Sequence, residues 1–198
     1  MLTPVVVHSD RYDAMTHPRL GDVVAWQLWW GATYPGTYSQ LEPDWSLTAR
    51  VRPTDASPTT RLGGTEPDTV EQRCIGSHGA VKFHIMLLVP VPETVTVTGA
   101  LSVTVGTPLP GQPMRGPSHE VDPGTLTAGT VRRLRVVSMA SALRPTRHPR
   151  MLANSPVPGT EWVYDLAEPP EQLRWHELAD NDFGYVRRSE ILLVDLET

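Results

Sequence analysis

The chain has 198 residues, a length that suits one domain or two small ones. No apolar run approaches the roughly 18–20 residues that a membrane-spanning helix needs, and no charged stretch with an apolar core marks a signal peptide. Cys74 is the only cysteine, which excludes a disulfide framework within the chain. These features predict a soluble, globular, cytoplasmic protein with no membrane partner.

Alternation of apolar and polar residues, the period of a β-strand, recurs along the chain, and helical periodicity is nearly absent. In chain order the alternation predicts strands at residues 5–8, 23–30, 47–52, 69–75, 81–89, 94–106, 130–139, 161–166, 185–188 and 190–196. Gly99 falls on the apolar face of the 94–106 run and predicts a bulge or a sharp bend there. The one predicted helix covers residues 169–179, whose prolines suit a first turn. The predicted fold class is all-β.

The strands leave two architectures open. Alternate prolines in residues 89–93 remove hydrogen-bond donors and favour an extended connector. This connector divides the chain into an N-terminal β lobe, residues 1–90, and a C-terminal β lobe, residues 91–198. Each lobe has enough strands for a small barrel. The alternative is one continuous domain in which all strands form a single sandwich.

Six of the 13 aromatic residues lie between residues 26 and 45, which makes this stretch the most distinctive of the chain. By alternation Trp29 points away from the core face of its strand. Tyr34, Tyr38 and Trp45 follow in a loop with a turn signal. Exposed aromatics of this kind anchor protein interfaces. The predicted partner-binding residues are Trp29, Tyr34, Tyr38 and Trp45. The alternatives are that the loop folds back and buries them as a second small core, or that they form a platform for a small ligand or nucleic acid.

Charge is divided unevenly along the chain. Residues 123–160 carry six arginines and no acid, and residues 161–198 carry three arginines and ten acids. By alternation Arg133 and Arg135 form a solvent-facing stripe, and Arg144, Arg147 and Arg150 lie in a loop at 143–160. These five arginines are candidates for binding an anion or an acidic partner. The alternative is that the basic and acidic segments pair within the fold, because consecutive strands usually lie side by side.

The sequence carries none of the common catalytic signatures, such as a Gly-x-Ser-x-Gly elbow, a phosphate-binding glycine loop or His-Glu-x-x-His. Histidines and acids at residues 8–17 have no second cluster to complete a metal site, so no metal, cofactor or catalytic residue is predicted. Cys74 has the pattern of a small buried apolar residue, and His84 that of a solvent-facing strand residue.

Residues 21–28, 129–137 and 193–196 resemble segments of a small β-rich family in actinobacteria. The resemblance implies a β-rich fold; the family has no assigned activity and so implies no site residues. The predicted function is a non-catalytic binding or assembly protein whose partner is another protein. A barrel that binds single-stranded nucleic acid is the first alternative, and a hydrolase with dispersed catalytic residues is the second.

Overall fold

The computed structural model describes residues 1–31, 41–61, 69–105, 122–145, 152–178 and 185–198. In these ranges the two helices are single short turns, α1 (Ser9–Tyr12) and η1 (Pro123–Thr125), and neither is long and apolar enough to cross a membrane. The all-β prediction is confirmed. The strands are β1 (Leu2–Val7), β2 (Val23–Trp30), β3 (Ser46–Pro53), β4 (Thr59–Arg61), β5 (Thr69–His78), β6 (Val81–Leu88), β7 (Thr94–Thr98), β8 (Leu101–Val105), β9 (Leu126–Pro145), β10 (Leu152–Pro156), β11 (Trp162–Leu166), β12 (Trp175–Glu177) and β13 (Tyr185–Glu197).

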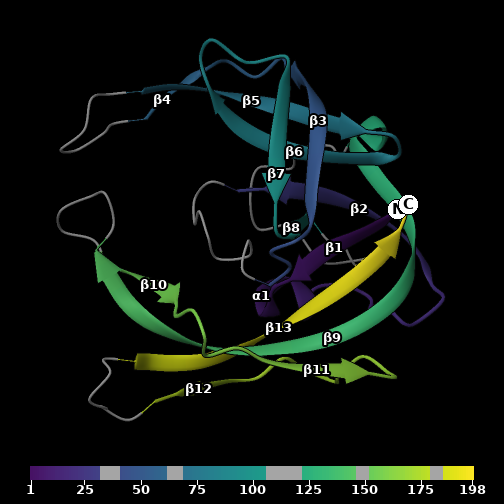
Figure 1. Ribbon diagram of the computed structural model, residues 1–198, viewed down its shortest axis with the longest axis vertical. Helices are drawn as coiled ribbons and strands as arrows, with labels where there is room; N and C mark the ends of the chain where they lie inside the picture. The colour runs from purple at the N-terminus through teal and green to yellow at the C-terminus, as the bar shows by residue number, and fades with distance from the viewer. Residues whose placement is uncertain (32–40, 62–68, 106–121, 146–151, 179–184) are drawn as a thin grey trace.

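The described strands belong to one hydrogen-bonded sheet, whose main path runs β10-β9-β13-β1-β8-β2-β6-β5-β3-β7. The long strand β9 pairs with β13 and also with β2, so β9, β13, β1, β8 and β2 form a closed ring of neighbours. Figure 1 shows β9 and β13 crossing the lower half of the molecule and β3, β5 and β7 crossing its upper half. Several pairings join a strand before residue 90 to a strand after it, as the pairing of β3 with β7 does. The division into two lobes stays a prediction.

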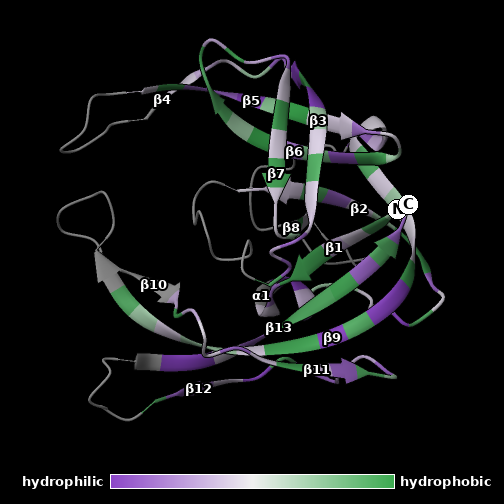
Figure 2. Ribbon diagram, in the orientation of Figure 1, coloured by the Kyte–Doolittle hydropathy of each residue, from purple (hydrophilic) through white to green (hydrophobic). Residues whose placement is uncertain are grey.

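The sheet has an apolar cluster on each of its two faces at β9 and β13. The register places Val136 beside Leu192 on one face, here called the inner face, and both belong to the main core. On the opposite, outer face, Val137 lies beside Ile191 in a second buried cluster that includes Val6. Figure 2 shows β1 and the C-terminal half of β13 as largely hydrophobic, which agrees with burial on both faces.

The predicted bend at Gly99 is present. The 94–106 run is divided into β7 and β8, and Gly99 between them has a φ of 82°. Its backbone N–H donates to the carbonyl oxygen of Trp45 at 3.1 Å. A positive φ is open to glycine because it lacks a Cβ, so this position requires glycine to turn the chain.

We expect Gly99→Val to lower the free energy of unfolding by more than about 1 kcal/mol, because a β-branched residue is strained at positive φ. Thr98→Val is the matched control, since Thr98 is exposed on β7 and has no positive φ. Denaturant unfolding of the two variants measures the difference. Equal stability of both variants would show that Gly99 is not required for the bend.

The helix expected at 169–179 is wrong for the described residues of that range. Its last part forms β12, in which Trp175 pairs with Ser189 of β13. Just before it, the backbone N–H of Arg174 donates to a carboxylate oxygen of Glu190, and the N–H of Glu190 donates to the carbonyl of Arg174, both at 2.8 Å. An isolated helix of this length is marginal in water, and here the backbone groups find partners in β13 instead.

Candidate protein-binding surface

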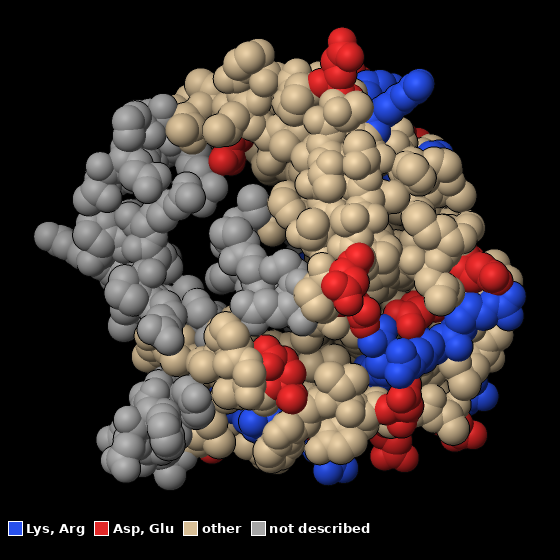
Figure 3. All heavy atoms as spheres, in the orientation of Figure 1, with Lys and Arg blue, Asp and Glu red and all other residues tan. Residues whose placement is uncertain are grey.

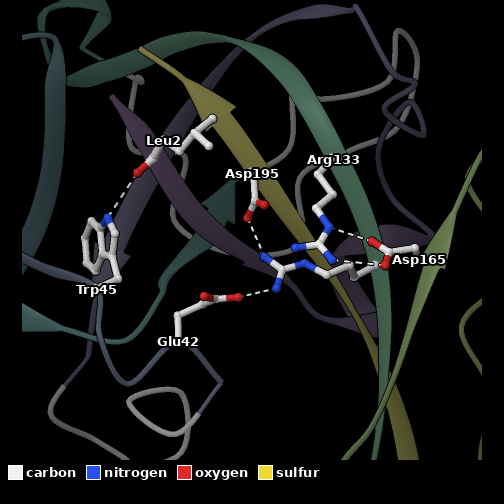
Figure 4. A network of polar contacts seen from close by, with 7 residues as sticks. Leu2, Glu42, Trp45, Arg133, Asp165 and Asp195 are labelled. Atoms are coloured by element: carbon white, nitrogen blue, oxygen red, sulfur yellow. Dashed lines mark hydrogen bonds and ion pairs between the residues drawn. The ribbon is translucent and has the colours of Figure 1, made fainter.

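The basic and acidic segments meet on the outer face of β9 and β13. Arg135 is 6% exposed and donates to Asp195 on β13 at 2.5 Å. It also forms an ion pair with Glu42, which comes from the segment that leads into β3 (Figure 4). The expectation that Arg135 faces solvent is therefore wrong, because this part of the outer face is covered.

The neighbouring arginines are paired as well. Arg133 contacts both carboxylate oxygens of Asp165 on β11, at 2.5 and 3.0 Å (Figure 4). Arg132 forms an exposed ion pair with Glu197. Figure 3 shows basic and acidic groups side by side at the lower right of the molecule, over the region of β9 and β13. At these three arginines the structure has the intramolecular pairing that was the alternative to an anion site.

The surroundings of Asp165 and Asp195 shift their pKa values in opposite directions. The hydrogen bonds from Arg133 lower the pKa of Asp165 below its ordinary value. Asp195 behaves differently: burial raises its pKa above the ordinary value, although Arg135 lies beside it. Desolvation therefore exceeds attraction at Asp195, and its carboxylate depends on Arg135 for compensation.

The structure describes the other candidate arginines only in part. Arg144 lies on β9, opposite Ala153 of β10, and only its backbone is described. The predicted 143–160 loop is thus partly a hairpin of β9 and β10. Arg147 and Arg150 lie outside the described residues, and their anion-binding role stays a prediction.

The predicted aromatic anchors do not come together in the described residues. Trp45 packs against the main core, and its indole N–H donates to the carbonyl oxygen of Leu2 at 3.1 Å (Figure 4). Trp29 is half-buried and stacks on His84, with ring centroids 6.1 Å apart. Tyr34 and Tyr38 lie outside the described residues. Both tryptophans therefore already have partners within the fold.

His84 is 9% exposed, so the expectation that it faces solvent is wrong. Alternation places His84 on the face of β6 that points away from the core, but Trp29 on β2 covers His84 there. The side-chain amide of Gln27 donates to its Nε2 at 2.9 Å, and no described group bonds to its Nδ1. Burial lowers the pKa of His84, and the charge of Arg73 lowers it further. Together these two effects outweigh the charge of Asp122, which raises the pKa.

The lowered pKa of His84 predicts a pH-dependent loss of stability. Below the ordinary histidine pKa of about 6.5, the unfolded chain binds a proton at His84 that the folded chain does not. The free energy of unfolding should therefore fall as the pH drops from 7 toward 5. Urea unfolding across this range should show a shallower fall in His84→Gln than in the unsubstituted protein. Parallel curves would contradict a depressed pKa at His84.

Large exposed apolar side chains instead occur on β11, where none was predicted as a site. Trp162, Val163 and Tyr164 are consecutive and are 56%, 52% and 53% exposed. Trp162 and Tyr164 lie on the inner face and Val163 on the outer face, as their register with β9 requires. The sequence signal was the Trp-Val-Tyr run itself, which is apolar toward both faces and not alternating.

The side chain of Arg188 holds Trp162 in place. The Arg188 guanidinium carbon lies 3.9 Å from the centroid of the Trp162 ring. The same guanidinium donates to the carbonyl oxygens of Ser138 and Thr160, each at 3.0 Å. It thereby joins β13, β9 and the residues that lead into β11. One face of the indole is fixed by this cation–π contact, and the side chain still exposes more than half of its surface.

β11 is also an edge strand in the described part of the chain. It pairs antiparallel with β9 through residues 134–138, and no described strand pairs with its other side. Every second residue of an antiparallel strand directs its N–H and C=O to one side, so the free side of β11 presents unpaired backbone groups. Exposed aromatics and an open hydrogen-bonding edge therefore coincide at β11.

Metal or thiol chemistry finds no support in the described residues. They contain no group of three or more histidine, cysteine or acidic side chains that could hold a metal ion. Cys74 is buried in the main core, and burial raises the pKa of its thiol, which disfavours the reactive thiolate.

Comparison with protein-family models, with curated proteins and with solved structures finds no match. The resemblance to an actinobacterial β-rich family therefore stays a prediction.

Proposed function

We propose that the protein is a non-catalytic binding module that receives an extended segment of a partner protein along the free edge of β11. The observation that carries the proposal is the run of three consecutive, half-exposed apolar side chains on an edge strand. An extended segment that adds to a sheet edge gains backbone hydrogen bonds from the edge and specificity from alternate side chains.

The character of the edge supports this use. Exposed sheet edges are usually protected by charged residues or proline. The only charged residue within β11 is Asp165, which is engaged by Arg133 on β9. Tryptophan and tyrosine dominate the binding energy of many interfaces, and a side chain held in place beforehand loses less entropy on binding. Arg188 provides this ordering for Trp162.

Selection of peptides tests the proposal. A displayed library of random linear peptides is enriched on the protein and depleted on its Trp162→Ala, Tyr164→Ala double variant. We expect enriched peptides whose affinity, measured by calorimetry, falls at least tenfold in Trp162→Ala. Methylation of the one alternate set of backbone nitrogens that faces β11 should abolish binding, because pairing with an edge strand requires those N–H groups.

Trp175→Ala is the matched control, because Trp175 is 58% exposed on β12, which pairs with β13 and not with β11, and lies on the outer face. It should bind the same peptides with unchanged affinity, and both tryptophan variants should melt near the temperature of the unsubstituted protein. Equal loss in both variants would contradict the proposal. If the protein dimerises and Trp162→Ala abolishes the dimer, the edge binds a second copy of the chain. That result would also overturn the proposal.

A further inference from the structure

A cavity of about 430 Å³ opens on the inner face beside β11. Val136 of β9 and Leu166 of β11 supply apolar surface, and Tyr164 lines its side toward the free edge of β11. Glu171 and Glu190 bring two carboxylates to it, from the segment before β12 and from β13. The cavity thus combines an apolar floor, an aromatic ring and acidic groups.

Strand register decides which side chain of a bound segment can enter the cavity. Residues that lie directly opposite each other in a sheet point to the same face, so the residue opposite Tyr164 would point to the inner face. Neighbouring strands lie about 4.8 Å apart, and the side chain would have to pass Tyr164 to reach Val136. Only a long side chain covers that distance.

The charge around the cavity favours a cation. Arg174 also lines the cavity, and its backbone N–H donates to Glu190 at 2.8 Å. The described charged residues that line the cavity are thus two acids, Glu171 and Glu190, and one base, Arg174. A long cationic side chain can place its methylene stem on apolar surface, its charge beside acids and its cation over an aromatic ring.

We propose that the segment received by β11 carries an arginine or lysine opposite Tyr164. Its stem lies over Val136 and Leu166, and its cation meets Glu171 and Glu190. This inference rests on the proposed function, because it names the side chain that the β11 edge selects. Since alternate residues of a strand share a face, an apolar residue two positions away would lie against Trp162.

The peptides enriched on the unsubstituted protein test the inference. We expect them to share a basic residue two positions from an apolar one, and replacement of that basic residue by methionine should weaken binding at least tenfold. Glu171→Gln and Glu190→Gln should each weaken it at least threefold. Glutamine at position 190 keeps an oxygen that can accept the Arg174 N–H, so the local fold is retained. Glu177→Gln is the control, because Glu177 on β12 lies on the outer face and should leave affinity unchanged.

The outcomes separate the two proposals. Peptides that depend on Trp162 but lack a basic residue, or that bind both glutamine variants with full affinity, would overturn the inference and leave the proposed function standing. A library that yields no Trp162-dependent peptide would overturn the proposed function, and the inference with it.

Discussion

Replacement of Arg135 by alanine is expected to lower the free energy of unfolding by about 3–5 kcal/mol, the cost of leaving a buried charge without its partner. Arg135 is the only described cation that contacts both Glu42 and Asp195, and all three side chains lie in or at the edge of a covered face. Without it, Asp195 keeps a buried carboxylate whose pKa is already raised by burial. Denaturant unfolding at neutral pH measures the loss.

Two further variants separate burial from charge. Arg132→Ala removes an arginine whose ion pair with Glu197 is half-exposed, and should cost no more than about 1 kcal/mol. Arg135→Met combined with Asp195→Leu replaces the buried pair by apolar groups, and should recover much of the stability that Arg135→Ala loses. A combined variant as unstable as Arg135→Ala would contradict this account.

The pH dependence of Arg135→Ala has a defined sign. A carboxyl group whose folded pKa is raised binds a proton more readily in the folded state, so lowering the pH relieves the cost of its burial. In Arg135→Ala the pKa of Asp195 loses the opposing effect of Arg135 and rises further. The stability gap between this variant and the unsubstituted protein should therefore narrow as the pH falls from 7 toward 4.

Local patterns predicted most of the strands. The prediction for residues 23–30 coincides with β2, and glycine on the apolar face of the 94–106 run marked the bend at Gly99. Alternation and the tolerance of glycine for positive φ act within a few residues, so they can be read directly from the sequence. The helix predicted at 169–179 is wrong because local patterns do not show contacts between distant segments. Glu190 accepts from the backbone N–H of Arg174, and the carbonyl of Arg174 accepts from the N–H of Glu190.

Exposure could not be read in the same way. Alternation placed Arg133 and Arg135 on one face correctly, but it could not show that the segment with Glu42 covers one of them. Likewise Tyr164 shares its face with buried Val136, and it is exposed because β11 lies at an edge of the described sheet. Edges and covered faces are set by pairing between segments far apart in the chain, which periodicity does not encode.

The close approach between Gly76 and Phe83 predicts the second large effect. The two residues lie opposite each other on β5 and β6, and Phe83 is fully buried in the main core. A Cβ at position 76 would lie 2.5 Å from Cζ of the Phe83 ring, well inside van der Waals contact. Phe83 is fully buried, and packed interiors leave little room for a ring to shift, so Gly76→Ala should cost about 1–3 kcal/mol, as overpacking of a core does.

A double variant shows whether the ring is the cause of that loss. Phe83→Leu alone should destabilise the protein, because it removes buried volume from the main core. Added to Gly76→Ala, however, it removes the ring atoms that the new Cβ would meet. The two substitutions should therefore cost clearly less together than the sum of their separate effects. Ser77→Ala, at the exposed neighbouring position of β5, should change stability little. Strict additivity of the two core substitutions would place the cost of Gly76→Ala in the backbone of β5 and not in the packing against Phe83.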